Sequence, residues 1–284
     1  MHKVAILTDT NSGIMEDNDE KGLFVIPMPI NINGNEYFEG LNISNDEFYQ
    51  QQTSGADIKT SMPSLFTLEE IWNKILANYE TIVYLPMSSA LSSACEKATI
   101  LSQEKFLDKV FVADIKRISC SLKIATENAL TLAKQGLSAK EILEHLDSTK
   151  EDDTIYISIP TLTYLKKGGR LTPAASIVGT MLSIKPVLQI QRGKLDSFAK
   201  CFAFNACKIK MKNALKKDIE TRLANKDLKF FVAHTRNLEQ AQQFAKELEQ
   251  DLNITIDIID ELPLSIATHI GPGSLACGCS VILN

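Results

Sequence analysis

Short apolar runs and amphipathic stretches alternate through the first half of the chain. Three runs of strand length, Val4–Leu7, Thr81–Leu85 and Val110–Ala113, each end in a polar loop. Helical spacing of apolar residues follows the loops, over residues 65–78, 93–103, 119–134 and 138–147. This order of strand, loop and helix predicts βαβ units and therefore a doubly wound, mostly parallel sheet.

Local signals add further elements to this half. Residues 23–32 have the composition of a single strand, and Asn33-Gly34 predicts a hairpin turn into a return strand over residues 35–38. Capping boxes, in which a serine and a glutamate three residues later satisfy free backbone amides, predict helix starts at Ser44 and Ser138.

The second half mixes a hairpin with helices. Arg192-Gly193 separates two strand-like runs, and Thr154–Ile159 either closes the first sheet or enters the next one. The other expected elements are helices at 162–167, 173–181, 205–223 and 238–252, strands at 229–234, 254–259 and 280–283, and a loop at 268–273. We therefore expect an α/β protein with a mixed sheet in its second half. The predicted domains are residues 1–160 and 161–284, with a ligand site at their junction.

Composition agrees with two globular domains, because 284 residues exceed the usual size of one. The net charge of -5 argues against nucleic acid as a partner and allows at most transient membrane contact, since both reward a basic surface. No stretch has the roughly 18 apolar residues of a membrane helix. The opening run ends at Thr8-Asp9-Thr10 without a signal-peptide cleavage site. With six cysteines and no CxxC pair, we expect a soluble, cytoplasmic protein with reduced thiols.

Hydroxyl groups crowd three loops that follow strands. The GxSxG, Walker A, HExxH and GxGxxG signatures are absent from the sequence. The hydroxyl-bearing residues are Thr8, Thr10 and Ser12, then Thr60, Ser61 and Ser64, then Ser88, Ser89, Ser92 and Ser93. Hydroxyls and helix N-termini beyond the carboxyl ends of strands predict an anion site that needs no lysine or arginine. Each of these hydroxyls, taken alone, could instead cap a helix or stabilise a turn. The three loops do not by themselves identify which ligand would bind.

Two metal-dependent hypotheses stay open. Asp9 and Asp114 follow strands and could hold a metal beside phosphate-binding loops, as in a phosphotransferase or hydrolase. Cys277, Cys279 and His269 could contribute to a zinc site, although their spacing is poor and a fourth ligand is missing. No paired acidic motif supports the first hypothesis, so we expect no metal and no cofactor.

The hydroxyl loops belong to a longer, ordered set of motifs, and with this set the chain resembles the bacterial DegV family. In order, the family motifs are T-D-S/T, T-S-x-P-S, S-S-x-L-S-G-T, L-K-x-G-G-R, I-K-P and H-x-G-P-G. Their counterparts here are Thr8–Thr10, Thr60–Ser64, Ser88–Ala94, Leu165–Arg170, Ile184–Pro186 and His269–Gly273. Each motif is weak alone, but the set spans the whole chain at the expected spacing and is specific.

The resemblance implies two α/β domains with a lipid tunnel between and within them. It also implies a carrier that has no enzymatic activity of its own. Such a carrier holds a long-chain fatty acid for a separate dihydroxyacetone-kinase-like subunit, which makes acyl phosphate for phospholipid synthesis. By the same resemblance, Thr60 and Ser92 hydrogen-bond the carboxylate, Ser61 and Ser89 are neighbours, and His269 lies close to it.

Other matched positions carry further implications and two departures. The resemblance implies that Arg170 contacts the kinase and that Asp9 lies near the carboxylate. Ser93 stands where the family motif has glycine, which puts the carboxylate geometry in question. Phe202 stands where many family carriers have an arginine that contacts the kinase. A lipid sensor without a kinase partner therefore stays open as a third hypothesis.

Overall fold

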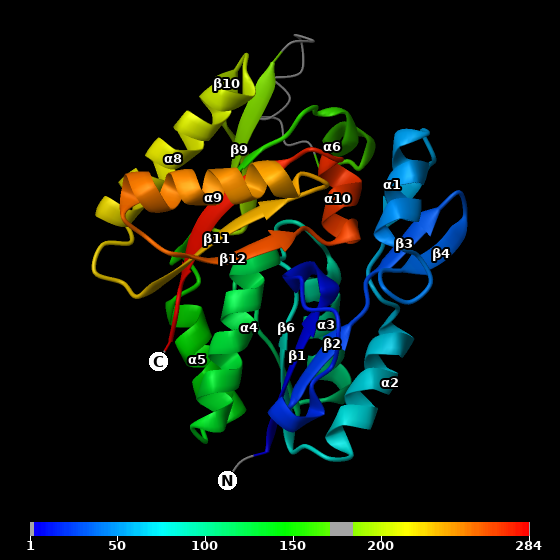
Figure 1. Ribbon diagram of the computed structural model, residues 1–284. Coiled ribbons are helices and arrows are strands. Elements are labelled where there is room, and N and C mark those ends of the chain that lie inside the picture. The colour runs from blue at the N-terminus through cyan, green and yellow to red at the C-terminus, as the bar shows by residue number, and fades with distance from the viewer. Residues whose placement is uncertain (1–2, 171–183, 284) are drawn as a thin grey trace.

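The computed structural model describes residues 3–170 and 184–283, which form three sheets and the helices that cover them (Figure 1). The first sheet has four parallel strands. In spatial order these are β2 (Leu23–Ile26), β1 (Val4–Asp9), β6 (Thr81–Leu85) and β7 (Val110–Val112). Two short 3-10 turns, η1 (Thr10–Ser12) and η2 (Asp19–Lys21), connect β1 to β2.

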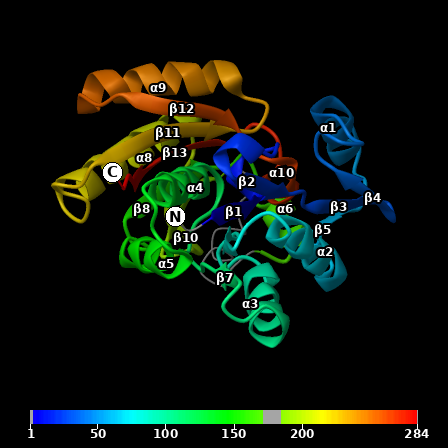
Figure 2. The same ribbon diagram turned by 90° about the horizontal axis from the view of Figure 1, so that it is seen from below.

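Helices cover both faces of this parallel sheet. On one face lie α4 (Ser119–Lys134) and α5 (Ala139–Ser148), and on the other lie α2 (Leu65–Leu76) and α3 (Ala94–Lys105) (Figure 2). Apolar side chains of the strands are buried on both faces, as the near-continuous apolar runs of these strands require. The predicted doubly wound, parallel arrangement is confirmed.

The second sheet has six strands and is mixed. Its spatial order is β10 (Lys194–Cys201), β9 (Lys185–Gln191), β8 (Asp153–Ser158), β13 (Leu275–Val281), β11 (Leu228–His234) and β12 (Ile256–Glu261). Only the pair β11–β12 is parallel. One face packs on α8 (Phe204–Glu220) and α9 (Leu238–Leu252), and the other contributes to a core with the start of α4.

Strand β8 and helix α4 connect the two large sheets. The run Thr154–Ile159 was expected either to close the first sheet or to enter the next one. Strand β8, which contains most of this run, belongs to the six-stranded sheet. Helix α4 packs on β1 and also on β13. Just before α4, the buried guanidinium of Arg117 donates to Ser280 Oγ and to Thr149 O, both at 2.7 Å. These contacts tie the sheets together, while the domain boundary near residue 160 stays a prediction.

A small antiparallel sheet forms the third unit, in the order β4 (Asn35–Phe38), β3 (Pro29–Ile32) and β5 (Ile58–Thr60). Helix α1 (Asn45–Thr53) packs on it, and its capping box is present as predicted. The Asn33-Gly34 hairpin turn is confirmed, with φ of 52° and 90° at the two central residues. Positive φ at both positions is what this turn requires.

Two predictions about single elements are wrong. Residues 23–32 form two strands in different sheets, because Pro27 and Pro29 lack the amide hydrogen that a continuous ladder needs. Residues 268–270, expected in a loop, end helix α10 (Leu264–Ile270), and the loop begins only at Gly271. Residues 268–270 contain no glycine or proline that would end the helix earlier. It ends at Gly271, which has a φ of 72°.

Strand β5 was not predicted, and Thr60, expected in a loop, ends it; several other differences concern element ends. Strand β13 begins five residues before its predicted start at residue 280, since small residues such as Ala276 and Gly278 mask its strand signal. Short α6 (Thr163–Lys167) and the β9–β10 hairpin agree with prediction, whereas the helix expected at 173–181 lies outside the described residues. Within residues 3–170 and 184–283, every helix is too short or too polar to cross a bilayer.

Candidate functional site

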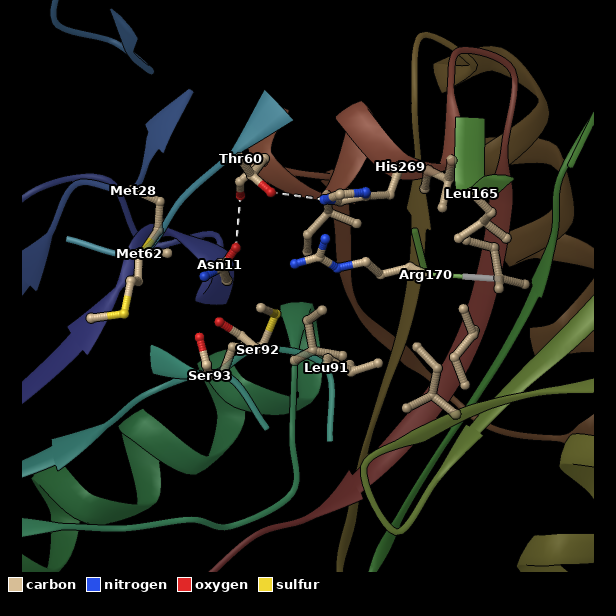
Figure 3. Close-up of a pocket in the computed structure, with 18 of the residues that line it drawn as sticks. Asn11, Met28, Thr60, Met62, Leu91, Ser92, Ser93, Leu165, Arg170 and His269 are labelled. Carbon is tan, nitrogen blue, oxygen red and sulfur yellow. Dashed lines mark hydrogen bonds between the residues drawn. The ribbon is translucent and has the colours of Figure 1, made fainter. Parts of the chain in front are cut away.

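A cavity of about 330 Å³ lies where the three sheets meet. Its volume falls in the usual range for small-molecule sites. Most of the lining is aliphatic or thioether, and the apolar residues are Met28, Met62, Met87, Leu91, Ile118, Ile157, Leu165, Leu188, Ile190, Leu195, Ile266 and Ile270. The polar lining residues are Asn11, Thr60, Ser61, Ser92, Ser93, Arg170, Ser265 and His269. The chain therefore encloses an apolar space with one group of polar side chains (Figure 3).

Elements from all three sheets build this lining. Thr60 ends β5 of the small sheet, and Ser92 lies in the loop between β6 and α3. Ile157 of β8 and Leu188 of β9 supply part of the apolar wall from the six-stranded sheet. Helix α10 contributes residues from both its first turn and its last turn, including His269. The cavity is thus a product of the tertiary arrangement and not of one local motif.

Thr60 and His269 are joined by a hydrogen bond, with 2.9 Å between Thr60 Oγ1 and His269 Nε2. The other ring nitrogen, Nδ1, is buried and has no hydrogen-bond partner. Burial, with a smaller effect from the charge of Arg170, lowers the pKa of His269 to about 4. The imidazole is therefore neutral at neutral pH. An unpaired lone pair is less costly to bury than an unpaired N–H, so the proton belongs on Nε2.

This tautomer leaves the hydroxyl proton of Thr60 available. If His269 Nε2–H donates to Thr60 Oγ1, the threonine O–H can donate to a further acceptor in the cavity. Ser92 has the same capacity, because its Oγ accepts from Ala94 N at 3.2 Å and its own proton is not used by that bond. Two neutral O–H donors thus line one cavity.

Arg170 also lines the cavity, which the sequence did not predict for a basic residue. In Figure 3 its guanidinium points toward the space between His269 and Ser92. Arg170 is exposed and donates to Gly168 O at 2.7 Å. The cavity lining thus includes a basic residue in addition to the hydroxyl groups that the sequence predicts. This contact with the end of α6 holds the exposed Arg170 side chain at the edge of the cavity.

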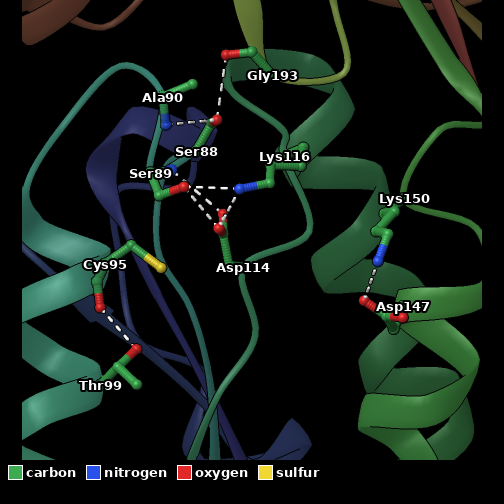
Figure 4. Close-up of polar contacts among 10 residues, drawn as sticks. All are labelled: Ser88, Ser89, Ala90, Cys95, Thr99, Asp114, Lys116, Asp147, Lys150 and Gly193. Carbon is green, nitrogen blue, oxygen red and sulfur yellow. Dashed lines mark hydrogen bonds and ion pairs between the residues drawn. The ribbon is translucent and has the colours of Figure 1, made fainter.

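Ser89, by contrast, does not reach the cavity lining. Its Oγ donates to Asp114 Oδ2 at 2.6 Å and accepts from Lys116 Nζ at 2.7 Å (Figure 4). Burial raises the pKa of Asp114, but the hydrogen bonds from Lys116 and Ser89 outweigh it, so the net pKa is lowered. In the same loop, Ser88 Oγ donates to Gly193 O at 3.1 Å. These two serines fasten the loop that carries Ser92 and do not face the cavity.

The first hydroxyl loop also serves the backbone. Thr8 Oγ1 donates to Leu85 O, Thr10 Oγ1 accepts from Met28 N, and Ser12 Oγ donates to Asp9 O. For these residues the capping and turn interpretation holds. Asn11, from the same segment, does line the cavity, and its Oδ1 accepts from Ser265 Oγ at 2.7 Å. Sequence reasoning missed both of these residues, because an amide in a turn and a serine within a helix carry no distinguishing pattern.

The carboxylates proposed as metal ligands are engaged elsewhere. Asp9 accepts hydrogen bonds from Asn11 and from Met87 N, and burial raises its pKa to about 6. Asp114 is paired with Lys116. The site geometry therefore does not favour a metal-dependent phosphotransferase.

The zinc hypothesis is not supported either. Cys277 and Cys279 lie in the apolar core beneath α8 and α9, and burial raises the pKa of both thiols far above its usual range. His269 lies instead in the cavity wall, hydrogen-bonded to Thr60. Among the residues that the structure describes, no three His, Cys, Asp or Glu side chains are grouped to hold a metal ion.

The fold and the cavity together define an α/β protein in which parallel and mixed sheets surround an apolar space whose lining includes a few polar side chains. A family model described as "Uncharacterised protein, DegV family" matches residues 3–281. This chain belongs to the DegV family. A DegV domain-containing protein of Lactococcus lactis is 31% identical over 283 residues, covering 98% of this chain and 99% of that protein. One of Streptococcus pyogenes serotype M1 is 29% identical, covering 97% and 98%.

Solved structures agree over the full length. A fatty acid binding DegV family protein from Streptococcus agalactiae matches with a TM-score of 0.86 and 27% identity, covering 100% of both chains. A DegV family protein from Thermus thermophilus, described by its fatty acid binding, has the same TM-score at 24% identity, covering 99% of this chain and 100% of its own. At 24% identity, the similarity to the Thermus thermophilus protein is evidence for the fold only. The predicted DegV-like α/β fold is thereby confirmed.

Proposed function

We propose that this protein binds one long-chain fatty acid, with the tail in the apolar cavity and the carboxylate beside Thr60, Ser61, Ser92 and His269. The proposal is carried by one observation: an apolar cavity whose lining includes neutral O–H donors, those of Thr60 and Ser92. The Streptococcus agalactiae relative, described as fatty acid binding, gives independent support because it shares the fold over its whole length.

Burial of the tail supplies the affinity in this proposal. A palmitate-like tail has about fourteen methylene or methyl groups, and each contributes about 0.8 kcal/mol when it leaves water. The gross gain is on the order of 11 kcal/mol, from which the cost of association is subtracted. A weak polar anchor then suffices, and the hydroxyls mainly fix the direction in which the acid enters.

The head group is held by a shared set of donors. Thr60 and Ser92 each offer a free O–H, while exposed Ser61 lies beside Thr60. Arg170 adds a positive charge at the rim, which favours an anion over a neutral lipid. Ser89 has a supporting role, because its contact with Asp114 fixes the loop of Ser92.

Chain length is the variable that tests this proposal. Delipidated protein would be titrated with saturated fatty acids of increasing length in a fluorescent fatty-acid displacement assay. We expect the affinity to rise roughly fourfold for each added methylene until the cavity is full, since about 0.8 kcal/mol corresponds to that factor. An affinity that does not depend on length would rule out tail burial as the source of binding.

We further propose that the bound carboxylate is presented to a separate kinase of the dihydroxyacetone-kinase-like type for acyl-phosphate formation. A neutral His269 next to the carboxylate could stabilise its attack on a phosphoryl group. Exposed Arg170 is the proposed kinase contact. His269→Ala should lower acyl-phosphate formation in the presence of kinase and ATP much more than it lowers fatty-acid affinity. Equal losses in both assays would contradict this role.

A lipid sensor without a kinase partner is the second candidate. Phe202 is 71% exposed at the turn between β10 and α8, where the family resemblance predicts a kinase-binding arginine. The two candidates differ in one outcome: the loaded protein either yields acyl phosphate when kinase and ATP are added, or stays unchanged.

A further inference from the structure

Helices α6 and α10 approach each other unusually closely at two glycines. A Cβ added to Gly168, at the end of α6, would lie 2.1 Å from His269 Nδ1 and 2.8 Å from His269 Cε1. A Cβ added to Gly271, just after α10, would lie 2.2 Å from a ring carbon of Tyr164 in α6. Each helix thus places an aromatic ring against the glycine of the other. Real Cβ atoms do not approach other atoms this closely, so these two contacts exist only because both residues lack side chains.

The contact at Gly168 bears directly on the cavity. The edge of the His269 ring that carries Nδ1 and Cε1 lies against Gly168, while Nε2 lies 2.9 Å from Thr60 Oγ1. The buried, unpartnered state of Nδ1 follows from this packing, because the end of α6 shields that nitrogen from water. The imidazole therefore fills the space between α6 and β5 with its two nitrogens at opposite sides.

If the His269 ring were displaced, neither Thr60 nor the main chain of α10 could move to restore their hydrogen bond. Thr60 is fixed by backbone pairing of β5 with Ile30 of β3. The main chain of α10 is held by Gln52, whose Nε2 donates to Ala267 O at 2.9 Å. A shift of the ring by one ångström or more would lengthen the bond to Thr60 beyond hydrogen-bonding distance.

We propose that Gly168 is a positioning residue: its missing side chain lets the end of α6 press the imidazole of His269 into hydrogen-bonding contact with Thr60. The inference rests on the proposed function, because it gives the glycine a role in arranging the carboxylate donors. Gly168 has a φ of -79°, which any residue can adopt. Gly168→Ala therefore introduces only the steric contact and no backbone strain.

Titration of the His269 ring by NMR in the ligand-free protein tests the positioning itself. In Gly168→Ala the ring leaves its packed position, so its pKa should rise from about 4 toward the usual 6.5. Lys167→Ala, an exposed substitution one residue earlier, is the matched control and should leave the titration unchanged. An unchanged His269 titration in Gly168→Ala would overturn the inference whether or not a fatty acid binds.

A double-mutant cycle on fatty-acid affinity tests whether the glycine acts through the histidine. Gly168→Ala alone should weaken binding by about the same factor as His269→Ala, and the double variant should bind no more than about twofold weaker than His269→Ala alone. Losses that multiply would show that Gly168 acts independently of the ring. If Gly168→Ala fails to fold, the double variant should restore folding, because it removes the ring atoms that the new methyl group meets. A double variant that also fails to fold would overturn the inference.

Discussion

The hydroxyl groups of the three serine- and threonine-rich loops fall into two sets. Those of Thr8, Thr10, Ser88 and Ser89 bond to backbone or to Asp114 and thereby shape the loops. Those of Thr60 and Ser92 line the cavity and keep a proton to donate. Sequence alone cannot separate the sets, because the same residue types in the same loops serve both purposes.

We expect Thr60→Ala combined with Ser92→Ala to weaken fatty-acid binding by roughly tenfold or more. Each substitution removes a donor to a charged carboxylate, and such bonds are among the stronger ones. The displacement assay measures the change, and thermal unfolding shows whether the fold is kept. Thr131→Ala with Ser148→Ala removes two exposed hydroxyls from α4 and α5 and serves as the control. An unchanged affinity in the site variant would refute the assignment of the anchor.

Among the elements, α10 has the largest influence on the site. It carries Ser265, Ile266, His269 and Ile270 into the cavity wall. Its first turn is held by Glu39, whose carboxylate accepts from Leu264 N at 2.8 Å. Burial raises the pKa of Glu39 to about 7; the bond from Leu264 opposes this and the charge of Glu261 adds to it. The helix is thus anchored by a group that titrates near neutral pH.

This anchor predicts a pH dependence of stability. Between about pH 4.5 and 7 the folded state keeps the proton of Glu39 while the unfolded chain has lost it, so the free energy of unfolding falls as pH rises. Glu39→Gln removes this loss, which is on the order of 3 kcal/mol. Urea unfolding at pH 5 and pH 7.5 measures the difference. Exposed Glu36→Gln in β4 is the control, and a parallel pH dependence in wild type and Glu39→Gln would contradict the prediction.

Most elements could be predicted from the sequence, because their signals are local. The helix over residues 119–134 and the hairpin at Asn33-Gly34 follow from apolar spacing and turn chemistry. Helix α10 could not be predicted, since its seven residues show too few turns for helical spacing and end in a glycine–proline segment typical of a loop. The same limit hid Ser265, which reaches the site only because its segment is helical.

For the whole molecule, the cavity is the feature that depends on tertiary structure most completely. Its walls come from β5 of the small sheet, from β8 and β9 of the six-stranded sheet, from helix α10, and from the loops that follow β1 and β6 of the parallel sheet. Hydroxyl-rich loops predicted a site near strand ends. The family resemblance predicted Thr60, Ser61, Ser92 and His269, which line the cavity, but not Asn11 or Ser265. The position of Arg170 at the cavity and of Ser89 away from it depends on packing that no local pattern encodes.

Binding of one fatty acid in this cavity, with its tail buried, is the property on which the proposed function depends. Native mass spectrometry of the purified protein, before and after delipidation and incubation with palmitate, measures this most directly. We expect one added mass, equal to that of a single long-chain fatty acid, on the purified protein or on the reloaded one. A protein that stays without this mass in excess palmitate, or that gains several copies in proportion to ligand concentration, would contradict it.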